Sequence, residues 1–474
     1  MMLQNPIRIL FRRVAAARSL SATAVASSEA ELKVEKGEAK EWKPLYRRLS
    51  ALGGAPEGSV EKALNKWVRE GRTVKAVQLM KYVKELRKYK RHKHALELME
   101  WMVKTRGMNM SYTNHAIRLD LISKVRGVES AEEYFSSLPE SAKNQRTYGA
   151  LLSCYCSAKM ADKAAAIHKK MNELNLSSTL VYNNLMALYM KLSQPEKVAN
   201  QFQEMKVKNI APDNVTCCIL MSSFAALNDI DSVEVVIKEM EEGEDVTLQW
   251  SAYSTLASIY ISAGLITKAE CALKKLELLK DSRDREPLHF LISLYAGTGN
   301  LPEVKRIWKS LRSSFQKVTN VSYLTMLQAL NKLDDVDGMK QIYSEWESGY
   351  VTYDVKLTNV TIGAYLRNNL TDEAKAVWEK ASEKGAVLDL RTCELFLDYY
   401  LKNHKVGLSL NWLEKITTVV KQDEWKLDHT KMNMFLKCIE EAKDVEGAQK
   451  FGRCLKRLGC PDLKASELLR RITL

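Results

Sequence analysis

The sequence predicts an all-α fold, a solenoid of about ten to eleven stacked helix-turn-helix repeats. The first observation is self-similarity: a shift of 35 residues superimposes the segment 179–213 on the segment that follows it, so that Tyr189 aligns with Phe224. The second is periodicity, because apolar residues recur at three- and four-residue spacing on both sides of a Ser-Gln-Pro break at 193–195. Each unit therefore predicts two short helices, and such a pair must stack on neighbours to cover its apolar face.

The same register extends in both directions and defines the individual units. Most units are 33 to 36 residues long, and the one that begins at Leu390 runs for 39. Their expected starts are Tyr112, Gln145, Thr179, Asn214, Trp250, Arg285, Asn320, Val355, Leu390 and His429. An aromatic ring recurs late in the first helix, at Tyr155, Tyr189, Phe224, Tyr260, Tyr295, Tyr365 and Tyr400. Small or modest side chains recur early in the second helix, at Ala131, Ala164, Val198, Val233, Ala269, Val304, Ala374 and Ala448. We expect the small residue to allow close approach of the two helices while the ring fills the space between them.

Individual units also contain recognisable sequence motifs, with LVYNNLM from Leu180 near the start of a unit and QEMKVKNIAPD from Gln203 at its end. These motifs resemble those of the pentatricopeptide repeat, which begins roughly V-T-Y-N-x-L-I and ends E-E-M-x-x-x-G-x-x-P-D. The resemblance runs from about Tyr112 to Asp462 and, more weakly, back to about Ala76. It implies a right-handed superhelix and the pure-repeat class of plant organellar proteins. The tetratricopeptide repeat is the rival, but its first-helix Trp and Gly are not systematically present and the recurrent Asp at unit ends favours the pentatricopeptide repeat.

The first 30 residues have the composition of an organellar transit peptide. They are rich in Ala and Ser and contain no acidic residue before Glu29. Their early arginines favour the mitochondrial matrix over the chloroplast; these are Arg8, Arg12, Arg13 and Arg18. A disordered basic tail is the alternative. We expect the chain to be organised as a disordered transit peptide (1–30), a linker (31–58), divergent N-terminal capping helices (59–111), the repeat array (112–463) and a C-terminal tail (464–474).

The chain is basic, with 72 Lys and Arg residues against 58 Asp and Glu residues and a formal net charge of +14. This balance indicates a polyanionic partner. The densest positive run lies between Lys81 and Lys93 and contains one acid, Glu85. A solvated helix face is the alternative for this run, and within it His92 and His94 are expected to face solvent. The candidate phosphate contacts are Lys84, Arg87, Lys88 and Arg91.

Patterns that carry catalytic or metal chemistry are missing from the sequence. The nine cysteines are dispersed without zinc-ligand spacing, so we expect small buried hydrophobes in a reducing compartment. There is no Gly-rich phosphate loop and no nucleophile elbow. No apolar run reaches the length of a membrane span. The expectation is a binding protein with no enzymatic activity, no cofactor, no metal site and no small-molecule substrate.

The resemblance also implies which residues contact RNA, since each repeat of the family holds one nucleotide. The implied positions are the fifth residue of a unit and its last residue. Asn with Asp is the family's combination for a pyrimidine, usually uridine, and it occurs as Asn183 with Asp213, Asn359 with Asp389, and Asn433 with Asp462. Ser254 with Asp284 has the form associated with a purine. Capping of a helix start is the alternative role for these residues. The fifth positions that depart from the pattern are Gly149, Cys218, His289, Leu324 and Glu394.

Three functions remain open at this point. The first is an organellar adaptor that binds single-stranded RNA and supports the stability, processing or translation of transcripts. The second is a structural subunit of the mitochondrial ribosome, in which the same basic scaffold packs against ribosomal RNA. The third is a protein–protein scaffold. The second and third functions stay open because the set of polar pairs is incomplete, and a protein that recognises a strict RNA sequence needs polar groups in every repeat.

Overall fold

The computed structural model describes residues 43–108, 110–242, 248–281, 283–349, 353–421 and 425–459. In these residues all regular structure is helical, with 24 α-helices, one short 3-10 helix and no strand. The all-α solenoid prediction is therefore confirmed. The chain divides into two compact units, Met1–Leu248 and Gln249–Leu474, and the boundary falls between two hairpins. The predicted transit peptide and the tail 464–474 lie outside the described residues.

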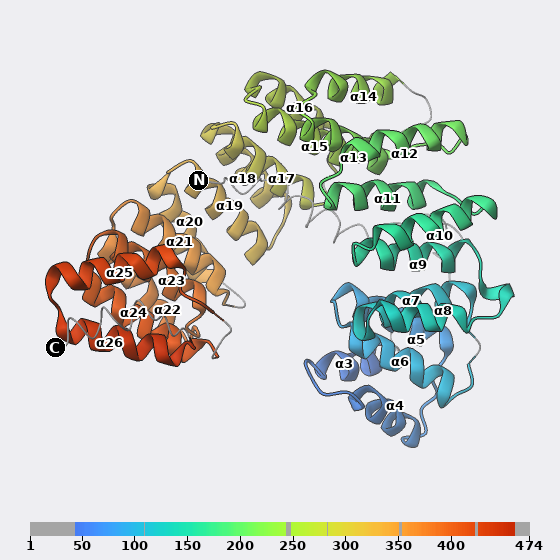
Figure 1. The fold of residues 1–474 in the computed structure, drawn as a ribbon, viewed down its shortest axis with the longest axis horizontal. Helices are drawn as coiled ribbons and strands as arrows, with labels where there is room; N and C mark the ends of the chain where they lie inside the picture. Colours follow the sequence, from blue (N-terminus) through green and yellow to red (C-terminus); the bar gives the residue numbers. More distant parts are fainter. Residues whose placement is uncertain are drawn as a thin grey trace. The chain divides into compact units, whose positions relative to one another are not determined.

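Each unit is a stack of helical hairpins, drawn blue to green for the first and green to red for the second (Figure 1). The helices of the first unit are α3 (Lys43–Ala51), α4 (Ser59–Arg69), α5 (Ala76–Lys88), α6 (His92–Lys104), α7 (Tyr112–Arg126), α8 (Val128–Ser136), η1 (Glu140–Ala142), α9 (Gln145–Ser157), α10 (Ala161–Glu173), α11 (Thr179–Lys191), α12 (Glu196–Val207), α13 (Asn214–Ala226) and α14 (Ile230–Glu242). Those of the second unit are α15 (Trp250–Ser262), α16 (Ile266–Leu279), α17 (Glu286–Gly297), α18 (Leu301–Ser314), α19 (Asn320–Lys332), α20 (Val336–Gly349), α21 (Val355–Arg367), α22 (Thr371–Glu383), α23 (Leu390–Lys402), α24 (Val406–Val419), α25 (His429–Ala442) and α26 (Val445–Arg457).

The predicted unit starts coincide with the starts of the first helices. Nine of the ten odd-numbered helices from α7 to α25 begin at the predicted residue. The exception is α17, which begins at Glu286 because Arg285 is its N-cap. The period of the apolar pattern therefore fixed the register of the hairpins to within one residue.

The turn inside each hairpin from α5/α6 to α25/α26 contains a residue with a positive φ angle, which reverses the chain within a few residues. In many hairpins the N–H that follows this residue donates to the carbonyl of the recurring aromatic residue, as Leu265 N does to Tyr260 O at 2.8 Å. This bond is the one that closes a Schellman motif, so the ring marks a fixed place near the helix end. The turn residues are Lys90, Gly127, Lys159, Ser193, Asn228, Gly264, Gly299, Asp334, Asn369, His404 and Lys443.

The core of each hairpin contains the two side chains that the sequence singles out. All eight small or modest residues of the second helices are completely buried. Five of the seven rings are buried, and Tyr189 and Phe224 are half-buried. The burial of the small residues and of most of the rings agrees with their predicted place in the core of each hairpin.

The predicted linker contains a helix. Within residues 31–58 the structure places α3, whose Leu45 and Leu49 are buried in the hydrophobic core of the first unit. Helices α5 and α6 form a hairpin like those that follow. The described part of the linker is thus part of the folded unit, because its two leucines, four residues apart, cover one face of a helix.

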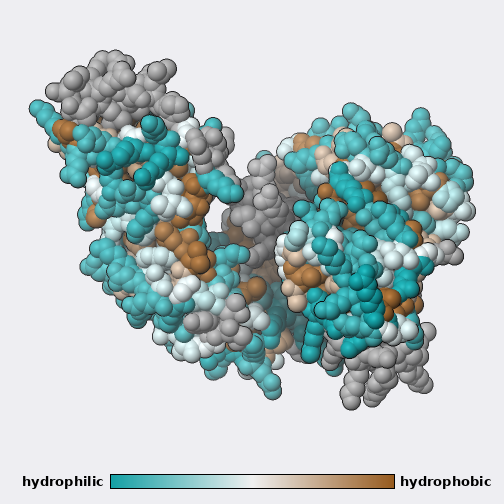
Figure 2. All heavy atoms as spheres, turned by 90° about the horizontal axis from the view of Figure 1, so that it is seen from below, coloured by the Kyte–Doolittle hydropathy of each residue, from teal (hydrophilic) through white to brown (hydrophobic). Residues whose placement is uncertain are grey.

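The first helices of successive hairpins pack against one another and form a row in each unit (Figure 1). The row runs through α7, α9, α11 and α13 in the first unit, and through α15, α17, α19, α21, α23 and α25 in the second. Most of the surface visible in Figure 2 is hydrophilic, with apolar atoms in separate patches. None of the helices in the described residues is long and apolar enough to cross a membrane.

Candidate nucleic-acid interface

The row of first helices places the fifth residue of one repeat beside the N-terminus of the next first helix. Asn183 lies in the second turn of α11, and Asp213 is the N-cap of α13. Asn183 Nδ2 donates to Asp213 Oδ1 at 2.9 Å, across 30 residues of sequence. The structure thus brings together this predicted pair of base-contacting residues.

A threonine completes this arrangement. Thr216 Oγ1 lies 2.8 Å from Asn183 Oδ1, and it accepts a hydrogen bond from Asp213 N at 3.0 Å. Asp213 Oδ1 in turn accepts from Thr216 N at 2.8 Å, which makes a capping box at the start of α13. Asn183 is 5% exposed and Asp213 is exposed. The amide therefore offers only an edge to a ligand, while the carboxylate is accessible.

The same geometry occurs in the second unit. Asn359 Nδ2 lies 3.2 and 3.0 Å from the two carboxylate oxygens of Asp389, the N-cap of α23. Thr392 Oγ1 lies 2.7 Å from Asn359 Oδ1, and Thr392 N donates to Asp389 Oδ1 at 2.8 Å. Asn359 is 7% exposed. Two repeats, one in each unit, therefore hold the same three residue types in the same contacts.

A third repeat uses different residues in the same positions. His289 Nε2 lies 2.8 Å from Ser322 Oγ, which lies 3.0 Å from Oγ1 of Thr319, the N-cap of α19. His289 departs from the amide pattern, yet it occupies the same contact with a hydroxyl at the next helix start. The hydroxyl partners Thr216, Ser322 and Thr392 were not among the predicted site residues. Their signal in the sequence is a hydroxyl residue 33 positions after Asn183, His289 and Asn359.

The predicted pair of Ser254 with Asp284 is not joined in this way, and the pair of Asn433 with Asp462 is only partly described. Ser254 is buried and its Oγ donates to Ser251 O at 2.9 Å, while Asp284 accepts from Glu286 N. Asp284 precedes the N-cap of α17, so it is one residue out of the position that Asp213 and Asp389 occupy. Asn433 is exposed on α25, and Asp462 lies outside the described residues.

The basic run on α5 divides into exposed and engaged cations. Lys84 and Lys88 are exposed, with Lys88 Nζ 5.9 Å from the centre of the Tyr89 ring. Arg87 pairs with Asp120 of α7 at 2.9 Å, and its side chain is 21% exposed. Arg91 donates to Ser50 O at 2.7 Å. Two of the four predicted phosphate contacts therefore also hold helices of the first unit together.

The two histidines of this run do not both face solvent, in contrast to the expectation. His94 is 6% exposed, and its Nε2 lies 3.3 Å from Ala55 O. His92 is half-buried, and burial lowers its pKa below the ordinary value. Both residues begin α6, whose inner face packs into the core, and charge density along the sequence does not reveal that face.

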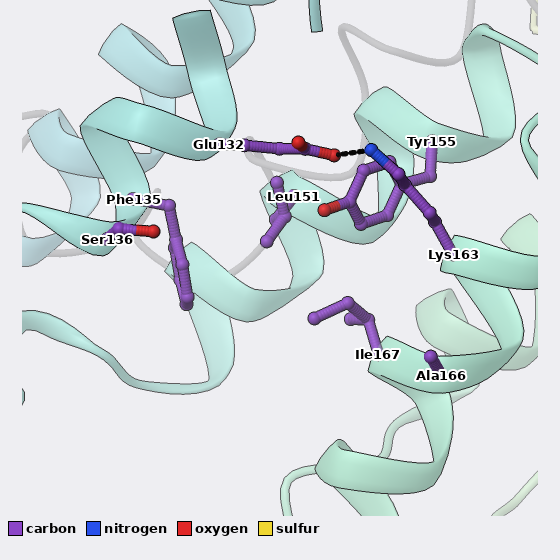
Figure 3. Close-up of a pocket in the computed structure, with 8 residues that line it drawn as sticks. All are labelled: Glu132, Phe135, Ser136, Leu151, Tyr155, Lys163, Ala166 and Ile167. Atoms are coloured by element: carbon purple, nitrogen blue, oxygen red, sulfur yellow. Dashed lines mark hydrogen bonds and ion pairs between the residues drawn. The ribbon is translucent and has the colours of Figure 1, made fainter. Parts of the chain in front are cut away.

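A hollow lined by α8, α9 and α10 lies apart from the predicted contact residues (Figure 3). Phe135, Leu151 and Ile167 form an apolar lining, and Lys163 pairs with Glu132 at 2.5 Å. The Lys163 ammonium lowers the pKa of Glu132. Because this ion pair is already made within the hollow, we treat it as a feature of hairpin packing.

The described cysteines are free thiols, and all but Cys271 are buried. Burial raises the pKa of Cys154 to about 11 and that of Cys156 to about 12. Thiols with such pKa values are poor nucleophiles and poor metal ligands at neutral pH. The prediction of buried, hydrophobe-like cysteines is confirmed for seven of these eight residues.

Comparison with known proteins gives matches to repeat families and to full-length relatives. Residues 177–226 match the PPR repeat family, and residues 146–176, 215–243 and 358–385 match the PPR repeat. A mitochondrial pentatricopeptide repeat-containing protein of Arabidopsis thaliana is 43% identical over 440 residues, which are 92% of this chain and 87% of that protein. The large ribosomal subunit protein mL101 (rPPR4) of Arabidopsis thaliana is 40% identical over 416 residues, covering 87% of this chain and 84% of that protein.

A solved structure shares the fold. PPR10 of maize in complex with an 18-nucleotide psaJ RNA element superimposes with a TM-score of 0.55 at 15% sequence identity. The match covers 92% of this chain and 62% of that chain, so this chain spans about three-fifths of the length of the solved protein. At this identity the likeness concerns the stacked-hairpin fold.

Proposed function

Because the chain belongs to the pentatricopeptide repeat family, we propose that it binds single-stranded RNA along the first helices of its hairpins. In this proposal it supports the stability, processing or translation of mitochondrial transcripts without catalysing a reaction. Relatives named as mitochondrial and the complex of PPR10 with RNA support the proposal. The Arg-rich, acid-poor segment 1–30 supports import into the mitochondrial matrix.

The observation that carries the proposal is the recurrence of one amide–carboxylate contact in both units, at Asn183 with Asp213 and at Asn359 with Asp389. An amide has two N–H groups and an oxygen with two lone pairs. The contacts of Asn183 described above use one N–H and one lone pair, which leaves a second donor and a second acceptor for a base. A pyrimidine needs a donor and an acceptor side by side from its reader, and an amide edge supplies both.

The backbone of the RNA would be held by cations outside these pairs. Lys84 and Lys88 are exposed on α5, and their ammonium groups can neutralise phosphates. The formal net charge of +14 favours association with a polyanion in general. Base contacts would then select sequence, and phosphate contacts would supply affinity that depends on salt.

Selection from a pool of randomised single-stranded RNA tests this function, with the protein lacking residues 1–30 and with matched variants. We expect the wild-type protein to enrich uridine at defined positions. Asn183→Ala and Asn359→Ala should each lower uridine enrichment at one position, by roughly 5- to 150-fold if a base contact is worth roughly 1–3 kcal/mol. Asn200→Ala, an exposed residue of the second helix α12, is the control and should leave selection unchanged. Unchanged selection by both fifth-position variants would refute base reading, and no binding at low salt would refute RNA binding.

A specific observation favours a second candidate, a structural subunit of the mitochondrial ribosome. The similarity to the large ribosomal subunit protein mL101 extends over 87% of this chain. Sedimentation of mitochondrial extracts separates the two candidates. A structural protein of the ribosome should sediment with the large ribosomal subunit at high salt. A transcript-binding protein should be released from it, since salt screens its phosphate contacts.

A further inference from the structure

The hydroxyl of the threonine beside each amide lies between the amide oxygen and the capping carboxylate. Thr216 and Thr392 are completely buried, in the first turns of α13 and α23. Thr216 Oγ1 accepts from Asp213 N, so its single proton is directed at the oxygens nearby: Asn183 Oδ1 at 2.8 Å and Asp213 Oδ1 at 3.0 Å. Thr392 Oγ1 has the same two kinds of neighbour, Asn359 Oδ1 at 2.7 Å and Asp389 Oδ1 at 2.6 Å.

These neighbours determine on which side the amide places its NH₂ group and on which side its oxygen. A carboxylate only accepts hydrogen bonds, so it requires the NH₂ end of the asparagine on its side. The threonine hydroxyl, when it donates its proton to the amide, favours the oxygen end on the other side. An amide rotated by 180° would place its oxygen against the Asp213 carboxylate and lose that hydrogen bond, and Thr216 would have to accept from the amide where it now donates. Asp213 and Thr216 therefore act together on the two ends of one side chain.

The orientation of the amide matters because uracil and cytosine differ by an exchange of donor and acceptor. Uracil presents an acceptor at O4 beside an N3–H donor, and cytosine presents an N4 amino donor beside an N3 acceptor. An amide fixed in one orientation matches one of the two bases. An amide that rotates freely matches either base and can recognise a pyrimidine without telling uridine from cytidine.

We infer that Thr216 and Thr392 are positioning residues that make Asn183 and Asn359 select uridine over cytidine. The inference rests on the proposed function, because it assumes that these amides contact bases. It assigns a role in base specificity to a third residue beside each asparagine and aspartate. This residue does not itself contact RNA. The contact of Ser322 with His289 at 2.8 Å places the same hydroxyl beside a different fifth residue.

Thr147 provides a matched control within the same unit. It is completely buried in the first turn of α9 and forms a capping box with Asn144, as Thr216 does with Asp213. Its hydroxyl lies 2.8 Å from Ala142 O, a backbone carbonyl, and not beside an amide of the preceding repeat. Replacing it therefore removes a cap of the same kind without touching a fifth-position side chain.

The experiment compares uridine-to-cytidine ratios in RNA selected from the randomised pool by the wild-type protein, Thr216→Val, Thr216→Ser, Thr147→Val and Asn183→Ala. Valine keeps the shape of threonine and removes the hydroxyl, whereas serine keeps the hydroxyl. Removal of a hydrogen bond of ordinary strength corresponds to roughly a two- to twelvefold change in an equilibrium. We expect Thr216→Val to lower the ratio by a factor in this range at the position that Asn183→Ala also affects. Thr216→Ser and Thr147→Val should keep the wild-type ratio, while Thr216→Val and Thr147→Val lower thermal stability to a similar extent.

The possible outcomes separate this inference from the proposed function. If Asn183→Ala changes the selection and Thr216→Val leaves the ratio unchanged, the positioning role is wrong and base reading stands. If Asn183→Ala changes nothing, base reading at this repeat is wrong and the positioning role with it. An equal loss of the ratio in Thr147→Val would show that capping as such, and not the contact with the amide, controls selection, and it would overturn the inference. The same set built on Thr392 and Asn359 repeats the test in the second unit.

Discussion

The amide nitrogen of Asn183 lies 2.9 Å from Asp213 Oδ1, although the two residues are 30 positions apart and belong to different hairpins. The same carboxylate oxygen caps α13 by accepting from Thr216 N. One side chain therefore serves both the stability of the next helix and the orientation of the amide of the previous repeat. Substitutions of Asp213 are therefore expected to affect both stability and RNA selection through the same carboxylate oxygen.

Replacement of Asp213 by alanine is expected to lower the stability of the first unit by about 0.5–2 kcal/mol, the usual cost of losing an N-cap. Asp213→Asn should cost only a few tenths, roughly, because asparagine caps a helix about as well as aspartate. The shift of the urea unfolding midpoint, followed by circular dichroism, measures both. Equal costs for the two variants would mean that the charge of Asp213, and not its capping oxygen, provides the stability.

The exposed and engaged cations of α5 are expected to respond differently to neutralisation. The double variant Lys84→Gln/Lys88→Gln should weaken RNA binding and reduce the slope of log affinity against log salt by about 0.7 for each phosphate that is no longer neutralised. Arg87→Gln should instead cost up to about 1 kcal/mol of stability, since it removes the half-buried pair with Asp120.

Lys169→Gln/Lys170→Gln is the matched control for the lysine pair, because both residues are exposed on the second helix α10. Titrations of labelled RNA at several salt concentrations give the slopes. A control variant that flattens the slope as much as the α5 variant would assign the effect to net charge and remove α5 from the interface.

The small residue of the second helix is expected to tolerate no enlargement. Ala164 is completely buried, so Ala164→Leu should destabilise the first unit by about 1–3 kcal/mol through overpacking. Its neighbour Ala165 is exposed, and Ala165→Leu should change stability by no more than about 0.5 kcal/mol. Unfolding midpoints in urea compare the two, and equal midpoints would contradict close helix approach at Ala164.

The cysteines are expected to differ in reactivity by exposure. Cys271 is the exposed thiol among the eight described, and burial raises the pKa of Cys154 and Cys156 to about 11 and about 12. Iodoacetamide at neutral pH should therefore label Cys271 first, with the buried thiols labelled only after unfolding in urea. Mass spectrometry of the labelled peptides reads out the order. Rapid labelling of Cys154 in the native protein would contradict the described packing of α9.

The first unit is expected to lose stability as the pH falls from about 7 to about 5.5, across the range in which an unperturbed histidine titrates. Burial lowers the pKa of His92, His115 and His168 below the ordinary value of 6.5, so the folded state resists protonation that the unfolded state accepts. A lowered pKa stabilises the fold above the unfolded value, and that stability is lost as the pH falls through the folded value. His168 is 7% exposed, with its Nε2 3.3 Å from Asn172 Nδ2.

His168→Gln keeps a polar side chain at this place and removes the titration. The variant should show a smaller drop in melting temperature between about pH 7 and about pH 5.5 than the wild-type protein, with part of the drop remaining from the other two histidines. Thermal unfolding at a series of pH values measures it. An identical drop in both proteins would show that His168 does not titrate differently in the two states.

The helix register could be predicted because it depends on features that repeat along the chain. Small residues such as Ala269 and rings such as Tyr260 recur at fixed places, and their burial follows from the period alone. The period does not report how strongly neighbouring hairpins pack, so it does not mark the boundary between the two compact units at Leu248. Helix α3 was missed for a related reason, since Leu45 and Leu49 offer too short a pattern to stand out from a polar segment.

The candidate site was predictable as a set of positions and not as a set of contacts. The pairing of Asn359 with Asp389 follows from the family pattern, and the structure joins them. The role of Thr392 depends on a side-chain direction that brings it within 2.7 Å of an amide 33 residues earlier, which no local pattern encodes. The role of Arg91 could not be predicted either, because a run of charges does not reveal that one of them donates a hydrogen bond to the backbone carbonyl of Ser50.

The contact of Asn183 with Asp213 and Thr216 has a consequence for recombining such arrays. A splice placed just before Asp213 would take Asn183 from one parent and its two partners, Asp213 and Thr216, from the other. A splice in the turn at Asn228, between α13 and α14, keeps all three side chains in one fragment and cuts where the backbone already reverses. The segment that can be exchanged with its recognition residues intact is therefore offset by one helix from the repeat that is apparent in the sequence.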